Sequence, residues 1–340
     1  MPSVVNVAIH ASQFPEQVRR DLIESLRARQ VNHKFHYDSV KQTQKWLALH
    51  EAHSPARTDP DCSATYERGF EAAAARLRER ERGERVQVIG LGCGGGQKDA
   101  RLLELLRAEG TRCFYTPSDV STAMVLTAHQ AASEVIPGED CFPLVCDLAT
   151  ADDLPEVLNQ GTPAEAARLI TFFGMIPNFE PQEILPRLFS LLRPGDPLLF
   201  SANLAPGPDY SAGMQRILPL YDNALTRDWL LAFLFDLGVE GADGELRFGV
   251  EDDPAGSGLK RVAAYFHFLQ ARQIRLGADG FEFKPGEAIR LFFSYRHTPG
   301  LARALLEEHG LEVAGQWITK SEEEGVSLCV RGPGLRGSNK

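Results

Sequence analysis

A glycine-rich segment contains the residues of this chain whose types and spacing point most directly to ligand chemistry. The segment VQVIGLGCGGGQK starts with an apolar run and contains Gly90, Gly92, Gly94, Gly95 and Gly96. Without side chains, these residues let the backbone approach a ligand where a Cβ would collide. The spacing of the first, second and fourth glycines also matches the G-x-G-x-x-G pattern used for dinucleotide pyrophosphates. The segment therefore predicts a nucleotide-binding turn between a strand and a helix.

Two aspartates help to decide which nucleotide such a turn would bind. Asp119 and Asp147 each end an apolar, strand-like run. The first carboxylate could accept hydrogen bonds from both hydroxyls of a ribose, which fits NAD and S-adenosylmethionine (SAM) equally. The second lies where a carboxylate or backbone group beside an apolar wall could recognise the amine of adenine. One acid at a strand end is often only a helix cap, but two acids after a glycine turn favour SAM over NAD.

These residues need a regular series of strands and helices to position them. Strand-like runs at residues 86–90, 113–117, 143–147, 169–173 and 197–203 alternate with helical stretches. This order predicts parallel strands joined by right-handed crossovers, which is an α/β, doubly wound, Rossmann-like sheet. Ligands of such sheets bind at the carboxyl ends of the strands.

The alternation of strands and helices stops near residue 205. A helix with apolar spacing then precedes period-two runs, such as residues 262–268, which predict antiparallel strands with one buried face. Beyond Thr298 a helix and two strand-like runs predict a closing hairpin, with residues 322–324 in a solvated turn. Upstream, residues 64–82 are rich in Ala, Arg and Glu and predict a solvent-facing helix.

Composition excludes several functional classes. The chain has 36 basic and 46 acidic residues, a net charge of −10, which disfavours a nucleic-acid partner. Six cysteines without a C-x-x-C pair indicate reduced thiols in a cytoplasmic protein. We expect no membrane partner, because no run approaches about 18 apolar residues. The pairs His33/His36 and His50/His53 have no third ligand nearby in sequence, so we expect no metal site.

The motifs GLGCGGGQK, SDVS, CDL, FFGMIPNFEP and FSYRHTP, in this order, resemble those of the SAM-dependent histidine Nα-methyltransferases of ergothioneine biosynthesis. The resemblance runs from about Val18 to the C-terminus, and GMIPNFEP is its most specific piece. It implies a class I methyltransferase sheet with an inserted α+β substrate domain. The expected segments are 1–63, the N-terminal helical part of the substrate domain; 64–204, the SAM-binding core; 205–296, the inserted substrate-binding domain; and 297–340, a helix and hairpin that complete the core.

The resemblance also implies roles for individual residues. The implied cofactor-binding residues are Gly90, Gly92, Lys98, Asp119, Asp147 and Leu148. The implied substrate-binding residues are Tyr37, Asn178, Tyr221, Phe292 and Ser294. Of these, Asn178 and Tyr221 are also the expected catalytic residues, because they would orient the amine and the carboxylate of an amino acid.

Departures from the family pattern concern the acceptor. Phe292 stands where the family carries a glutamate that pairs with imidazole, and Ser54 stands where a tyrosine is expected. Leu148 replaces an aromatic residue and Asn203 an acid. Loss of the carboxylate would leave an imidazole N–H unpaired, at a cost of roughly 1–3 kcal/mol. An apolar or aromatic side chain would suit Phe292 better, unless this phenylalanine belongs only to the protein core.

We therefore expect a SAM-dependent methyltransferase that acts on the amine of an amino acid, or of a small molecule derived from one, other than histidine. One alternative is a SAM-dependent transferase for another nucleophile of secondary metabolism, namely an oxygen, a sulfur or an aromatic nitrogen. The others are a catalytically inactive SAM-binding protein and an NAD-dependent oxidoreductase. The sequence assigns no general base, number of methyl groups or oligomeric state.

Overall fold

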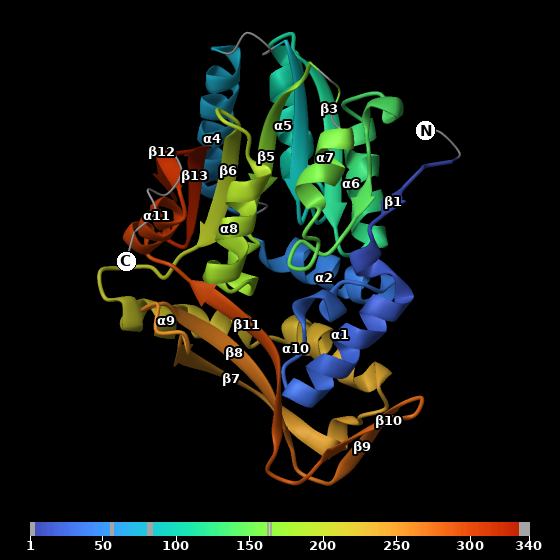
Figure 1. Ribbon diagram of the computed structural model, residues 1–340. Coiled ribbons are helices and arrows are strands. Elements are labelled where there is room, and N and C mark those ends of the chain that lie inside the picture. Colours follow the sequence, from blue (N-terminus) through green and yellow to red (C-terminus); the bar gives the residue numbers. More distant parts are fainter. Residues whose placement is uncertain (1–3, 55–57, 80–83, 162, 164, 333–340) are drawn as a thin grey trace, which may run out of the picture. The chain divides into compact units, whose positions relative to one another are not determined.

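The computed structural model describes residues 4–54, 58–79, 84–161, 163 and 165–332 (Figure 1). Its contacts divide the chain into two compact units. Unit 1 comprises Met1–Ser12, Pro55–Leu204 and His297–Lys340, and unit 2 comprises Gln13–Ser54 and Ala205–Arg296.

Unit 1 is built on one eight-stranded sheet. Its spatial order is β1 (Ala8–Ile9), β4 (Leu144–Val145), β3 (Arg112–Asp119), β2 (Arg85–Leu91), β5 (Ala167–Phe172), β6 (Pro197–Asn203), β13 (Glu324–Arg331) and β12 (Leu311–Ile318). The first six strands are parallel, and β13 is antiparallel to both of its neighbours. All six residues of β5 are buried, as expected for a parallel strand covered on both faces. The predicted doubly wound α/β sheet is confirmed.

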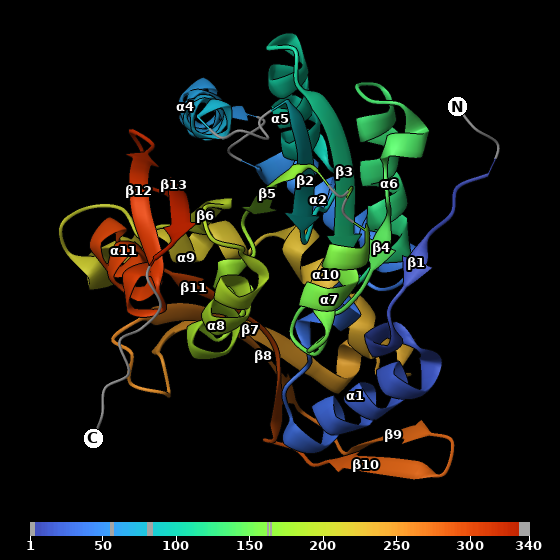
Figure 2. The same ribbon diagram turned by 45° about the horizontal axis from the view of Figure 1, so that its top comes forward.

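Helices cover both faces of this sheet (Figures 1 and 2). One face is covered by α4 (Pro60–Arg78), α5 (Gln97–Ala108) and α6 (Thr122–Ser133), whose apolar side chains share a core with β2 and β3. On the other face lie α7 (Leu154–Gly161) and α8 (Pro181–Leu191), while α11 (Pro299–Glu308) precedes β12. The helix predicted at residues 64–82 is present as α4, with Arg68 and Glu71 exposed, but it is not only solvent-facing, because Tyr66, Phe70 and Leu77 place its other face in the core. Residues 80–82 of this prediction lie outside the described residues.

The N-terminal segment also differs from the prediction. The family resemblance implied that residues 1–63 belong to the substrate domain, but β1 pairs in parallel with β4 through Ala8–Leu144 and Ile9–Val145. These two residues have too little pattern to be recognised as a strand. Their backbone pairing places β1 in unit 1, and α4, which starts at Pro60, lies there too.

Unit 2 combines two stretches of chain that are distant in sequence. The first contains α1 (Pro15–Ala28), the 3₁₀-helix η2 (His33–His36) and α2 (Val40–His53). The second contains α9 (Tyr210–Tyr221), α10 (Ala224–Asp236), the sheet β11 (Ala288–Arg296)–β8 (Lys260–Phe268)–β7 (Gly244–Asp252), and the hairpin β9 (Arg272–Leu276)–β10 (Asp279–Phe283). Both sheets are antiparallel.

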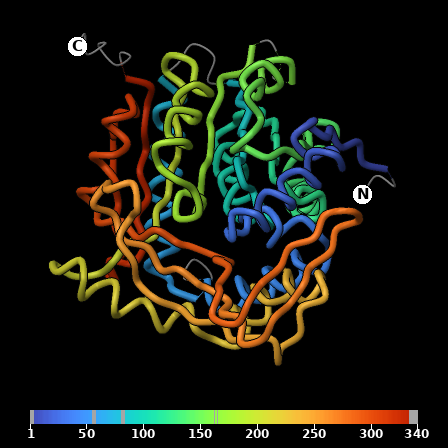
Figure 3. The backbone as a smooth tube through the Cα atoms, turned by 60° about the horizontal axis from the view of Figure 1, so that its bottom comes forward, coloured from blue at the N-terminus to red at the C-terminus, as the bar shows by residue number. Residues whose placement is uncertain are grey.

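A β-bulge joins the two stretches of unit 2. The register of β11 against β8 shifts between Arg290 and Phe292. Beside the shift, the backbone N–H of Val31 donates to the carbonyl of Arg290 at 2.8 Å, and Arg290 N–H donates to Arg29 at 2.9 Å. Figure 3 shows the blue N-terminal helices beside the orange strands of this unit. The bulge therefore fixes the position of the segment that leads into η2.

Among the described residues, no helix is both long enough and apolar enough to cross a bilayer.

Candidate cofactor and acceptor sites

The glycine turn lies in unit 1 between the end of β2 and the start of α5. Gly92, Gly94 and Gly96 all have positive φ, at 62°, 51° and 75°. L-residues adopt this region at a cost of about 1–2 kcal/mol. In addition, a Cβ on Gly92 would clash with the side chain of Met175. The turn therefore needs glycine for both its conformation and its packing, and the partly exposed backbone at Gly92 and Gly94 fits the close approach of a nucleotide.

A buried carboxylate fixes this turn to the sheet. Asp99, in the first turn of α5, accepts hydrogen bonds from Tyr115 Oη at 2.6 Å and Thr171 Oγ1 at 2.7 Å. Burial raises the pKa of Asp99 above its usual value. A Cβ on Gly90 would clash with this carboxyl group. Asp99 was not predicted from the sequence, and it gives Gly90 a packing role; the predicted contact between Gly90 and the cofactor stays a prediction.

Asp119 ends β3 and faces the glycine turn. One of its carboxylate oxygens accepts from the N–H of Gly94 at 3.3 Å, and the other accepts from Ser121 N–H at 3.0 Å. Burial raises its pKa from 3.8 to about 6. The carboxylate is thus held beside the turn at the carboxyl end of a central strand, where it fits the predicted role of accepting hydrogen bonds from a ribose.

The residues after β4 are joined to the N-terminal segment. The backbone N–H of Asp147 donates to Ser12 Oγ at 3.0 Å, and its side chain accepts from Ala149 N–H at 3.0 Å. His10 lies 2.8 Å from Ser12 Oγ and 2.7 Å from Asp153 Oδ1. Leu148 is buried beside Asp147. The predicted adenine-binding residues are therefore held in place by the N-terminal segment, which sequence reasoning did not connect with them.

Lys98 belongs to a buried polar network. Its Nζ donates to Tyr66 Oη at 2.7 Å and lies 4.0 Å from the centre of the Tyr66 ring. The same hydroxyl contacts Glu324 and lies 2.8 Å from Ser201 Oγ. The prediction that residues 322–324 form only a solvated turn was wrong for Glu324, which starts β13 and is buried. The predicted contact between Lys98 and the cofactor stays a prediction.

The motif FFGMIPNFEP follows β5 and contacts the glycine turn through Met175. Gly174 N–H donates to Ser201 Oγ at 2.9 Å, which ties the motif to β6. Asn178 ends the 3₁₀-helix η4 (Ile176–Asn178), and its N–H donates to the carbonyl of Met175 at 3.0 Å. The structure therefore places the segment of Asn178 beside the predicted cofactor turn.

In unit 2, the end of α9 meets one face of β11. Phe292, Ser294 and Arg296 lie two residues apart, so their side chains point to the same face of the strand. Tyr221 Oη is 2.7 Å from Ser294 Oγ and accepts from Arg296 Nε at 3.0 Å. The Phe292 ring lies 6.0 Å from that of Tyr221. Three predicted residues thus come together, and Arg296 is a fourth member of the group that was not predicted.

Trp229 of α10 connects this group to the N-terminal stretch. Its ring lies 5.8 Å from Phe292 and 5.4 Å from Tyr37. Its Nε1 donates to the carbonyl of His36 at 2.8 Å. Tyr37 and Phe292, which are far apart in sequence, therefore both pack against the ring of Trp229. Trp229 was not predicted, and its place in an apolar helix gave no sign of this role.

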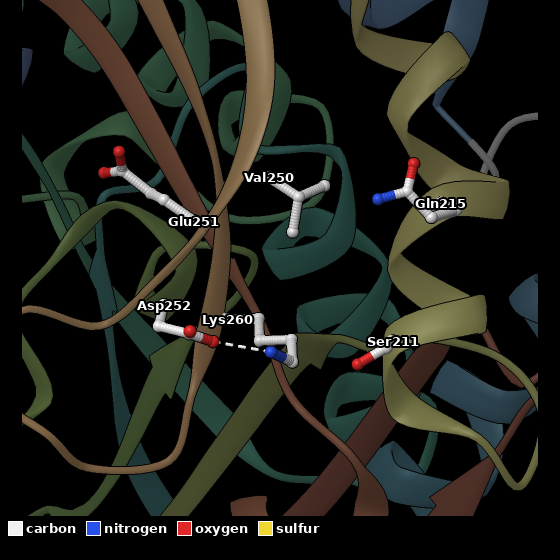
Figure 4. Close-up of a pocket in the computed structure, with 6 residues that line it drawn as sticks. All are labelled: Ser211, Gln215, Val250, Glu251, Asp252 and Lys260. Carbon is white, nitrogen blue, oxygen red and sulfur yellow. Dashed lines mark hydrogen bonds and ion pairs between the residues drawn. The ribbon is translucent and has the colours of Figure 1, made fainter.

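A separate polar hollow of unit 2 has a volume of about 250 Å³ (Figure 4). Its charged residues Asp252 and Lys260 pair with each other at 2.5 Å. Its lining consists of Ser211, Gln215, Val250, Glu251, Asp252 and Lys260, and includes none of the predicted site residues. We therefore do not assign this hollow to the reaction.

Comparison with known proteins decides the family. Residues 18–210, more than half of the chain, match the family described as "Histidine-specific methyltransferase, SAM-dependent". The chain belongs to this family. It is therefore a SAM-dependent methyltransferase, and SAM is its cofactor. The curated histidine N-alpha-methyltransferase of Mycobacterium tuberculosis (strain CDC 1551 / Oshkosh) is 24% identical over 253 residues, which cover 72% of this chain and 75% of that protein.

Solved structures of SAM-dependent methyltransferases are also similar to this chain. The magnesium protoporphyrin IX methyltransferase of Synechocystis PCC 6803 with bound SAH is 14% identical, has a TM-score of 0.44, and the match covers 86% of this chain and 95% of that one. The methyltransferase SibL is also 14% identical with a TM-score of 0.44, and the match covers 93% and 70% of the two chains.

The glycine turn gives a first test of the cofactor site. We expect Gly92→Ala to weaken SAM binding at least tenfold, because alanine is strained at φ 62° and its Cβ displaces Met175. The matched control is Gly110→Ala, which has a similar strain at φ 87° but no atom within 4 Å of the new Cβ. Both variants should lose folding stability in thermal unfolding, whereas calorimetry with SAM should single out Gly92. Equal SAM affinity in the two variants would contradict the assignment.

Asp119 gives a second test, in the form of a pH dependence. The ionised carboxylate is the form that accepts both ribose hydroxyls, and its pKa is about 6. We therefore expect SAM affinity to be full above pH 7 and to fall about tenfold by pH 5, where about a tenth of the carboxyl groups are ionised. Asp119→Asn should bind SAM weakly across this range without the fall. A parallel pH profile in the variant and the parent would exclude Asp119 as the titrating group.

Proposed function

We propose that this methyltransferase acts on the amine of an amino acid, or of a small molecule derived from one, whose side chain is apolar or aromatic and not imidazole. The observation that carries the proposal is the setting of Phe292. This side chain is only 6% exposed and packs against Trp229 and Tyr221. It stands where the family resemblance places a carboxylate. An imidazole N–H would lose its acceptor beside this ring, whereas an apolar or aromatic group would not.

The groups around Tyr221 support recognition of an amino acid's carboxylate. Arg296 donates to the Tyr221 hydroxyl, so this hydroxyl can donate its own proton to a ligand when Ser294 acts as a donor to it. Ser294 lies within hydrogen-bond reach of the same oxygen. A positively charged guanidinium behind two hydroxyl groups favours an anion. We therefore assign unit 2 as the substrate domain, with Tyr221 as the carboxylate-binding residue and Tyr37 and Phe292 beside the acceptor's side chain.

The roles in unit 1 follow from the chemistry of the cofactor. When bound, SAM supplies a methyl group on a sulfonium, which a neutral nucleophile can take in an in-line displacement. The glycine turn and Asp119 bind and orient the nucleoside, and Asp147 with Leu148 forms the adenine site. Asn178 holds the amine end of the acceptor with its amide. Such a reaction depends mainly on alignment and exclusion of water, so it needs few acid–base groups.

We place the reaction in the cytoplasm. All six cysteines are free thiols, and burial raises the pKa of each of them, to about 12 for Cys62, Cys113, Cys141 and Cys146, which suppresses the reactive thiolate. Unpaired, unreactive thiols suit a reducing compartment.

The acceptor can be identified by incubating the full chain with methyl-labelled SAM and each amino acid separately, followed by mass spectrometry. We expect label on the amine of aromatic or large apolar amino acids and at least tenfold lower kcat/KM for histidine.

Phe292→Glu should raise the relative rate with histidine, because it returns an acceptor for the imidazole N–H. Preference of the parent chain for histidine would refute the proposal. Label on an oxygen, sulfur or aromatic nitrogen would favour the alternative transferase. SAM binding without any methyl transfer would indicate a catalytically inactive protein.

Two alanine variants test the division of roles. Asn178→Ala should reduce acceptor turnover at least tenfold while SAM affinity changes less than twofold. Asp119→Ala should weaken SAM binding itself at least tenfold, because it removes the carboxylate that faces the ribose. Calorimetry with SAM and steady-state kinetics with the best acceptor separate the two effects. The roles are wrong if both variants lose SAM affinity to the same extent.

A further inference from the structure

His33 is a half-buried residue whose imidazole the proposed reaction leaves unused. It starts η2, and its ring lies edge-on to Phe293 at 4.6 Å and to Phe292 at 5.3 Å between ring centres. Both ring nitrogens are buried, and neither has a hydrogen-bond partner in the part of the chain that the structure describes. Buried polar groups without partners are rare and costly in folded proteins. Two such nitrogens on one ring, beside the acceptor residue Phe292, point to a missing ligand group.

The charge state of His33 defines what that group can be. Burial lowers its pKa well below 6.5, and the neighbouring His36, Arg290 and Arg261 lower it further. The imidazole is therefore neutral at pH 7, with one N–H donor and one lone-pair acceptor. Arg261 donates to Glu251 at 2.7 Å and Arg290 to Gln30 at 2.9 Å. These two guanidinium groups disfavour a cationic side chain on the acceptor.

The position of His33 is set by the β-bulge of β11. His36, on the same short helix, donates from Nε2 to the carbonyl of Leu291 at 2.7 Å, at the point where the strand's register shifts. Val31 N–H donates to the neighbouring carbonyl of Arg290. Hydrogen bonds on both sides of His33 therefore fix its backbone along the strand that carries Phe292. The two histidines therefore differ. His36 uses its Nε2 to bind the backbone carbonyl of Leu291, whereas neither ring nitrogen of His33 has a partner among the described residues.

We propose that His33 is a specificity-determining residue that exchanges a hydrogen bond with an uncharged polar group on an aromatic acceptor side chain, such as an indole N–H or a phenol O–H. The inference rests on the proposed function and narrows its substrate class. Phe292, Tyr221 and Trp229 supply the apolar contact with the aromatic ring. A purely apolar acceptor would leave the nitrogens of His33 unpaired, and a protonated one would meet the two arginines.

The test uses pairs of amino acids that differ only in the polar group. Tyrosine is compared with phenylalanine, and tryptophan with 3-benzothienylalanine, in which sulfur replaces the indole N–H. Binding is measured by calorimetry in the presence of SAH, so that no turnover is required. The full chain should prefer the polar member of at least one pair by tenfold or more. His33→Phe, which keeps an aromatic ring without the nitrogens, should reduce that ratio to within twofold and leave SAH affinity unchanged.

Controls separate specificity from folding. His267→Phe replaces a histidine on β8 of the same unit and should keep the parent's ratio. His33→Asn keeps one donor and one acceptor and should retain part of the preference. In the parent chain, ¹⁵N resonances of the His33 ring should shift when the preferred amino acid is added, a readout that needs no variant.

Three outcomes would overturn the inference. An unchanged ratio in His33→Phe, or ¹⁵N resonances that do not respond to the amino acid, would show that His33 is a packing residue while the proposed function stands. Absence of binding by every amino acid with SAH present would instead refute the proposed function and the inference together.

Discussion

The proposed cofactor site depends on the hydrogen bonds that the buried carboxylate of Asp99 accepts. This carboxylate joins the first turn of α5 to β3 through Tyr115 and to β5 through Thr171, and it occupies the space next to Gly90. Three elements that are separate in sequence therefore converge on one side chain. Since the glycine turn lies between β2 and α5, its positive-φ backbone has little freedom once the helix start is fixed. The raised pKa of Asp99 shows that burial works against its charged form, which the two donated hydrogen bonds partly offset.

Much of unit 1 could be predicted because parallel strands leave a strong pattern. In β5, for example, all six residues are buried and four of them are apolar, because both faces of the strand are covered. The glycine turn and Asp119 were found for a related reason, as their positions at strand ends follow directly from the order of the strands. The two-residue strand β1 could not be found this way. Its place depends on backbone pairing with β4 and on Ser12, neither of which has a periodic signature.

Residues whose role comes from tertiary contacts were missed. Glu324 follows two other glutamates in a stretch that reads as a solvated turn, yet it is buried and accepts a hydrogen bond from Tyr66, which in turn accepts one from Lys98. Trp229 lies in a helix that is apolar on most of its surface, so no pattern distinguishes it from ordinary core. Sequence spacing could indicate that Phe292, Ser294 and Arg296 share a face of a strand, but not that Tyr221 meets that face.

The chemistry of unit 2 differs from that of unit 1 in a consistent way. Around the glycine turn the side chains include the carboxylates of Asp99 and Asp119, whereas around Trp229 they are aromatic rings and neutral imidazoles. The β-bulge of β11 explains how both histidines of η2 are brought to this apolar region, because the shifted register exposes the carbonyl of Leu291 to His36. Surroundings of this composition gain little from contact with a charged side chain, whose desolvation would go uncompensated. Within unit 2, selection of the acceptor would then depend on ring contact and on a single neutral hydrogen bond, while the carboxylate of the amino acid is left to Tyr221 and Arg296.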